Sequence, residues 1–170
     1  MKKVIMLFFM MLSSSVFADP TIFGMEIGKM TEKEFNSMYK ASLTGTNKYS
    51  NGNMYSVPVS SINFDGLKGV TTIFSDKGKL LAVLTTLPKN KFDYLHKTLG
   101  GKYKLVNQKI PFVGNKSAIY KDGNTEISLD APHMSFDMSM NYISDELLQA
   151  FTLQSEQENR QKQKNEASQL

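Results

Sequence analysis

The chain of 170 residues contains no cysteine and no tryptophan, and it has only two histidines, His96 and His133. Without cysteine there is no disulfide, no thiolate nucleophile and no thiolate metal ligand. Stability must therefore come from the hydrophobic core. A catalytic triad with a histidine base could use only one of these two histidines.

Known site motifs are also missing. The sequence has no Gly-x-Ser-x-Gly elbow, phosphate-binding loop, His-Glu-x-x-His pair or Asp-rich calcium loop. His96 flanks the apolar face of an expected helix, and His133 shares one strand parity with Ser135 and Asp137, whose side chains run parallel rather than converge. We therefore predict a protein that is not an enzyme, with no catalytic, cofactor or metal residues. The alternative is a hydrolase whose carboxylate pair is assembled across the fold.

The stretch 130–140, DAPHMSFDMSM, places His133 among three methionines and raises the question of a soft-metal site. Side chains alternate between the two faces of a strand, so ligands drawn from both parities point apart. We predict a half-buried strand over 135–143 whose apolar parity faces the core instead of a copper ion. That parity comprises Met134, Phe136, Met138, Met140 and Tyr142.

The N-terminus has the anatomy of a secretory signal peptide. Lys2 and Lys3 precede the apolar run Val4–Met11, and small residues lead to a cleavage site after Ala18. The apolar run is shorter than the ~20 residues of a membrane span, which is the alternative. We predict a signal peptide over 1–18, a mature chain that starts at Asp19 and lies in the periplasm or is secreted, and no transmembrane segment after cleavage.

Net charge and length limit the partners and the number of domains that we expect for the rest of the chain. Two of the 20 basic residues belong to the signal peptide, so the formal net charge falls from +4 to +2 on cleavage. This balance gives no reason to expect nucleic-acid binding, which needs a concentrated basic face. We predict a single α+β domain over 19–153 and a polar tail over 154–170, helical or disordered, for which partner binding is the functional alternative.

Local signals predict three helices. Thr31 and Glu34 form a capping box flanked by the staple pair Met30 and Phe35, which places a helix over 32–40. A second helix is expected over 89–99 after Pro88, and a third begins after the cap Ser144.

Strand signals fill the intervals. Residues 43–53 are turn formers and are predicted to be a loop. Gly78 and the pair Asp122–Gly123 mark hairpin turns, and the apolar run 80–84 predicts a central strand buried on both faces. The predicted fold is α+β: an antiparallel sheet with short helices packed on it, in an order compatible with two similar helix-plus-hairpin halves. The expected strands are 54–59, 69–74, 79–86, 103–108, 116–120, 125–129 and 135–143.

A resemblance follows from several of these motifs. The segments Phe23–Gly28, Ile62–Leu67 and Val70–Phe74, with Gly78-Lys79-Leu80, resemble small exported bacterial proteins over about residues 23–87. The general shape is similar to the lipoprotein component of outer-membrane assembly and to the secreted β-lactamase inhibitor. The chain departs from both because it has neither the lipidation cysteine nor the inhibitor's cysteines. The resemblance implies a fold and the binding of proteins, and it implies no catalytic residue.

Two loops are candidate binding surfaces. The first, 44–55, places Tyr49 and Tyr55 among Asn, Ser and Gly, and the second, 110–115, carries Phe112 and Val113 between Pro and Gly. The structural alternative is that the tyrosines pin their loop to the sheet and Phe112 is buried. We predict a non-catalytic exported binding protein that acts on an envelope protein as inhibitor or accessory factor. A small-ligand or soft-metal carrier is the alternative.

Overall fold

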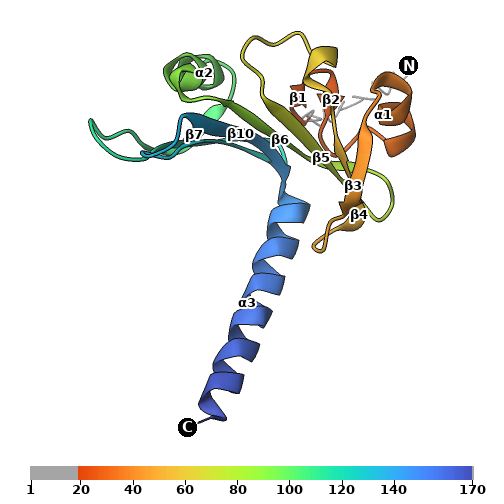
Figure 1. The fold of residues 1–170 in the computed structure, drawn as a ribbon, viewed down its shortest axis with the longest axis vertical. Helices are drawn as coiled ribbons and strands as arrows, with labels where there is room; N and C mark the ends of the chain where they lie inside the picture. Colours follow the sequence, from red (N-terminus) through yellow and green to blue (C-terminus); the bar gives the residue numbers. More distant parts are fainter. Residues whose placement is uncertain (1–18, 170) are drawn as a thin grey trace, which may run out of the picture.

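A computed structural model describes residues 19–169, so the predicted signal peptide 1–18 lies outside the described residues. Figure 1 shows an antiparallel sheet with α1, α2 and a short ribbon β1–β2 on one side and α3 leaving on the other. The eight strands lie in the order β3-β4-β5-β6-β10-β9-β8-β7. Their bounds are β3 Ser42–Thr46, β4 Asn51–Ser56, β5 Gly69–Ser75, β6 Leu80–Pro88, β7 Lys104–Lys109, β8 Lys116–Asp122, β9 Thr125–Ala131 and β10 Asp137–Ser144.

The sheet consists of two meanders of four strands, each preceded by a helix. Helix α1 (Glu32–Met38) precedes β3 to β6, and α2 (Phe92–Gly100), which follows the 3-10 turn η2 (Lys89–Lys91), precedes β7 to β10. The last strands of the two meanders, β6 and β10, pair at the centre of the sheet. The predicted α+β class is confirmed. The smaller elements are β1 Thr21–Ile22, β2 Met25–Glu26 and the 3-10 turn η1 Val59–Ser61.

Helix α1 begins as its sequence predicts. The Glu34 amide donates to Thr31 Oγ1 at 3.2 Å, and the Thr31 amide donates to Glu34 Oε2 at 2.8 Å, which completes the capping box. Hydrogen bonds from Thr31 lower the pKa of Glu34, the backbone bond most. The helix ends at Met38, because Tyr39 is extended at φ −121° and donates its hydroxyl to the Phe23 carbonyl.

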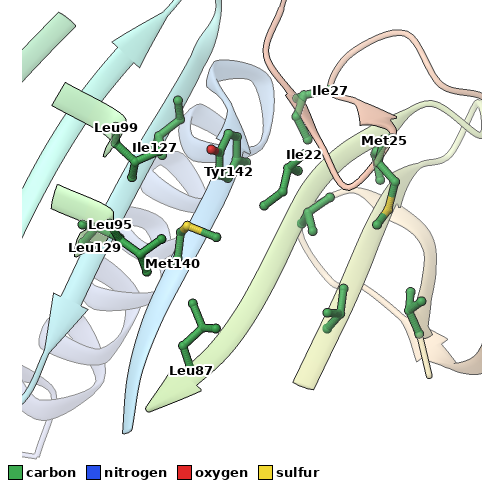
Figure 2. Close-up of a cluster of buried hydrophobic side chains, with 14 of the residues drawn as sticks. Ile22, Met25, Ile27, Leu87, Leu95, Leu99, Ile127, Leu129, Met140 and Tyr142 are labelled. Carbon is green, nitrogen blue, oxygen red and sulfur yellow. The ribbon is translucent and has the colours of Figure 1, made fainter. Parts of the chain in front are cut away.

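The main core lies between the sheet and the layer of α1, α2 and β1–β2. Figure 2 shows Leu95 and Leu99 of α2 directed at Ile127, Leu129 and Met140 of the sheet. The other face of the sheet has a smaller cluster that includes Ile73, Leu81, Ala82 and Leu147. Strand β6 contributes to both clusters, so the prediction of a central strand buried on both faces is confirmed.

Two predictions about the connections between strands were wrong. Residues 43–53, predicted as a loop, form most of the β3–β4 hairpin. All five residues of β3 are exposed, so backbone pairing at the sheet edge holds this strand without an apolar side-chain pattern. The turn between β8 and β9 consists of Gly123 and Asn124, with Gly123 at φ 52°, one residue later than the expected pair.

The methionine-rich stretch divides at Asp137, where β10 begins. Met138, Met140 and Tyr142 are buried, as predicted. The prediction was wrong for Met134 and Phe136, which are 92% and 93% exposed. They precede the strand, and the Ser135 amide donates to the Pro132 carbonyl in a turn, so strand parity does not direct them to the core.

Helix α3 (Asp145–Ala167) begins after Ser144, whose Oγ accepts from the Leu147 amide, as predicted. It spans 23 residues, or about 34 Å at 1.5 Å per residue. The helix passes without a break through the expected domain boundary at 153, and its distal part is polar with side-chain contacts such as Arg160–Glu156 at 3.2 Å. Among the described residues no helix has the length and apolar character needed to cross a bilayer.

Candidate functional site

The most exposed apolar side chains gather at one end of the second meander. Two loops lie at this end: the loop between β7 and β8 (110–115) and the loop between β9 and β10 (132–136). In an antiparallel meander every second connection lies at the same end of the sheet. Phe112 is fully exposed, and Val113 is 67% exposed. We call the four projecting side chains the apolar rim: Phe112, Val113, Met134 and Phe136.

Polar contacts hold the bases of the two rim loops. Asn115 Oδ1 accepts from the His133 amide at 2.7 Å and thereby joins one loop to the other. The Lys89 amide donates to the Phe136 carbonyl at 2.8 Å, and Lys89 Nζ donates to the His133 carbonyl at 2.9 Å. The backbone is therefore anchored to the end of β6 while the apolar side chains point outward.

Three lysines near the rim are paired with carboxylates. Lys91 contacts Asp65 at 2.7 Å and Lys116 contacts Asp93 at 3.1 Å. Lys68 forms an ion pair with Asp137. These pairs reduce the field of three lysines. Lys89, which contacts backbone carbonyls, and Lys109, which directly precedes the loop 110–115, form no ion pair among the described residues, so the surroundings of the rim are mixed in charge.

The structure separates the four residues that the sequence predicts as partner-binding. Phe112 and Val113 lie in the rim. Tyr55 is 8% exposed, packs on Phe35 and donates its hydroxyl to the Glu32 carboxylate, which raises the pKa of Tyr55. Its expected place on an exposed recognition loop is wrong, because β4 directs it to the core face of the sheet.

Tyr49 lies in the turn of the β3–β4 hairpin and faces α3. Its ring meets that of Phe151 edge to face with centroids 5.0 Å apart. Asn47 Oδ1 accepts from the Tyr49 amide at 2.9 Å and from the Ser50 amide at 3.0 Å, which fixes the turn.

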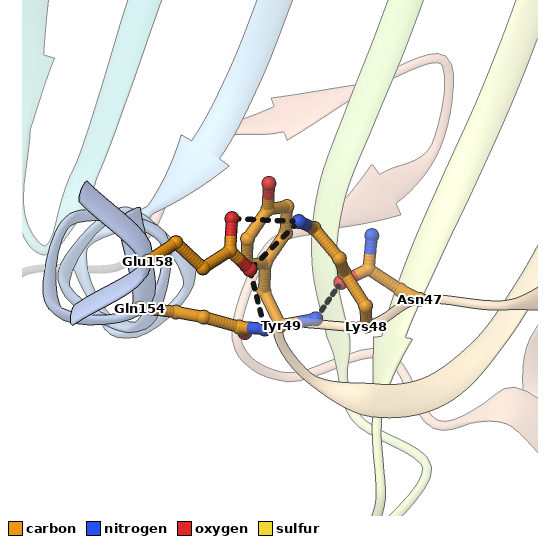
Figure 3. A network of polar contacts seen from close by, with 5 residues as sticks. All are labelled: Asn47, Lys48, Tyr49, Gln154 and Glu158. Carbon is orange, nitrogen blue, oxygen red and sulfur yellow. Dashed lines mark hydrogen bonds and ion pairs between the residues drawn. The ribbon is translucent and has the colours of Figure 1, made fainter. Parts of the chain in front are cut away.

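The same turn forms an ion pair with α3. Figure 3 shows Lys48 reaching Glu158, with Nζ 3.1 Å from Oε1, and Gln154 donating to that same oxygen at 3.1 Å. The Lys48 ammonium also lies 4.7 Å from the centre of the Tyr49 ring. Hydrogen bonding to Tyr49 and then to Glu158 raises the pKa of Lys48.

A recessed apolar cavity lies between α3 and the sheet. Met54, Ile73 and Ile143 on its floor belong to one row of residues paired across β4, β5, β6 and β10, in which the buried Ala82 lies between Ile73 and Ile143. The cavity measures about 380 Å³. We call it the apolar trench; its lining residues are Asn47, Tyr49, Met54, Ile73, Leu84, Ile143, Leu147, Leu148 and Phe151.

Both histidines make contacts that support the fold. His96 stacks on Phe92 with centroids 5.9 Å apart, and its Nδ1 is hydrogen-bonded to the Tyr120 hydroxyl. The amide of His133 anchors a rim loop, as described above. Within residues 19–169 no group of three or more His, Asp or Glu side chains is arranged to hold a metal ion.

Sequence reasoning found half of the rim and missed the other half. Met134 and Phe136 were assigned to the core because they continue the parity of Met138 and Met140. Pro132 was the available signal, since it interrupts a strand and marks the turn that exposes them.

Comparison with known proteins gives no relative for this chain: no family model, no curated protein and no solved structure matches it.

Proposed function

We propose that the protein is a non-catalytic, exported binding protein that uses its apolar rim to bind a protein partner in the cell envelope. The observation that carries this proposal is the exposure of four large apolar side chains on two anchored loops. Exposed apolar residues are ordinary when single, whereas a group on one surface marks an interaction site.

The shape of the rim supports a protein partner. Phe112 and Phe136 project from turns, so they need a partner that supplies pockets for them. Aromatic anchors that fill pockets dominate the binding energy of many protein interfaces. Three of the lysines near the rim are paired with carboxylates, which lowers the positive charge that would attract a strongly anionic surface such as nucleic acid.

The cellular role follows from two further expectations. We expect export because the N-terminal sequence resembles a signal peptide that is cleaved after Ala18. We expect the protein to act as an inhibitor or accessory factor because residues 23–87 resemble small exported binding proteins. Purification of the native protein from an osmotic-shock fraction, followed by N-terminal sequencing, tests export. We expect the sequence to start at Asp19; a start at Met1 in a cytoplasmic fraction would contradict it.

Affinity capture from an envelope extract tests the rim. The bait is the mature chain, and the test variant combines Phe112→Ser with Phe136→Ser. The matched control is Val106→Ser, because Val106 is 60% exposed within the edge strand β7 and is not one of the four rim residues. We expect the wild type and the control to retain the same partner and the double variant to lose it. Equal retention by all three proteins would reject the rim as the binding surface.

A further inference from the structure

We infer that the apolar trench is a binding site for one linear acyl chain whose carboxylate lies at Lys48. This inference is independent of the rim and of its protein partner. It rests on the width of the trench, on the chemistry of its lining and on the charge of Lys48, whose chain neighbours Asn47 and Tyr49 line the trench.

The trench is narrow. Its floor is one row of side chains that crosses four strands, and at ~4.8 Å between neighbouring strands the row is about 14 Å long. The next row on the same face is Ser56, Thr71, Leu84 and Asn141; of these only Leu84 is apolar, and it is the only one that lines the trench. A polar border this close to the floor favours a single chain over a broad ring system.

The volume of the trench agrees with one chain. At about 380 Å³ it lies near the lower end of the range of small-molecule sites, ~300–1,000 Å³. Met54, Leu84 and Ile143 are half-buried, so apolar surface remains for a ligand to cover. Leu147, Leu148 and Phe151 of α3 form the opposite wall.

The lining favours a hydrocarbon over a peptide. Among the described residues that line the trench, the polar side-chain groups are those of Asn47 and the Tyr49 hydroxyl. A peptide in this trench would bury amide and carbonyl groups without enough partners, which is costly. An alkyl chain has no such groups, and its transfer from water onto the floor is favourable.

Lys48 provides the charge for a head group. It adjoins the lining residues Asn47 and Tyr49, and its present partner is the Glu158 carboxylate at 3.1 Å. Both side chains are about half exposed, at 55% and 54%, so the pair is weak and a ligand carboxylate can replace Glu158 at little cost. Lys48 therefore favours a fatty acid over an uncharged alkyl compound.

Calorimetric titration with sodium dodecanoate, below its micelle concentration, tests the inference on the mature chain. We expect one site with a micromolar dissociation constant. Leu84→Glu should weaken binding by at least tenfold, because it places a carboxylate against the chain. Thr86→Glu is the matched control, since Thr86 is exposed on the same strand and face, and it should bind as the wild type does.

A second variant and a second ligand guard against misfolding. Phe151→Ser changes a half-exposed helix residue and should also weaken binding while the circular dichroism spectrum is unchanged. Lys48→Gln should weaken dodecanoate severalfold and leave dodecanol unaffected. Absence of saturable dodecanoate binding by the wild type, or equal binding by the folded Leu84→Glu and Phe151→Ser variants, would overturn the inference.

Discussion

The rim and the trench are both apolar, yet they differ in exposure and shape. The rim side chains project from two turns, and the trench side chains lie recessed between the sheet and α3. A projecting residue needs a pocket on its partner, whereas a recessed one offers a pocket to a ligand. We infer from this comparison that the backbone carrying an apolar residue decides which kind of partner it suits.

Their structural origins differ in the same way. Rim residues lie outside the strands, where no pairing directs them to either layer of the molecule. The floor residues of the trench lie within paired strands on the face that α1 and α2 do not cover, and the first turns of α3 cover them only in part. Stability should therefore depend on the trench and not on the rim.

The largest expected difference is in stability. Ile73 is buried in the trench floor, so Ile73→Ala should lower the free energy of unfolding by about 2–4 kcal/mol through lost burial and a new cavity. Phe112→Ala should change it by less than about 0.5 kcal/mol, because the side chain is fully exposed. Urea unfolding of both variants measures this difference. A comparable loss of unfolding free energy in Phe112→Ala would contradict the expected difference between the rim and the trench.

A partner assay should give the reverse order. Phe136→Asp introduces a charge into the proposed protein interface, so we expect affinity for the captured partner to fall by about 30-fold or more, as for an interface hot spot. Dodecanoate binding should be unchanged, since Phe136 is not in the trench lining. Surface plasmon resonance with the purified partner, beside calorimetry with dodecanoate, separates the two sites.

A smaller effect is expected where α3 meets the hairpin turn. Phe151→Ala removes the edge-to-face contact with Tyr49, worth about 0.5–1.5 kcal/mol. Hydrogen exchange should quicken in residues 47–50 and in the first turns of α3 and stay constant in the rim loops. Faster exchange in the rim loops would show that the two regions are coupled.

The smallest effect concerns pH. The pKa of Lys48 is raised in the folded protein, so its contacts stabilise the fold fully below its ordinary value near 10.5 and are lost as the pH rises through the higher folded value. Dodecanoate affinity should therefore be constant from pH 7 to 9 and fall at higher pH. Lys48→Gln should remove that alkaline fall; an unchanged fall in this variant would assign it to another group.

Local chemistry made much of the fold predictable. The capping box at Thr31, the glycine turn at Gly78 and the cap at Ser144 each involve residues within a few positions of one another, and all three are present. Strand β3 and the first residues of β4 were missed, because β3 is wholly exposed and relies on backbone pairing at the sheet edge.

The site was less predictable than the fold. Phe112 and Val113 were found because Pro and Gly bracket them in the sequence. The trench was not found, because its floor combines β4, β5, β6 and β10, and only the register between strands aligns those residues in one row. No local pattern contains that register.

The central claim is that the rim is a protein-binding surface, and site-specific photo-crosslinking in intact cells tests it most directly. A photoreactive phenylalanine analogue would replace Phe112 or Phe136, with position 106 on β7 as the control. We predict one discrete adduct of the same mass from both rim positions and none from position 106. The absence of an adduct at both rim positions, or the same adduct at position 106, would contradict the account.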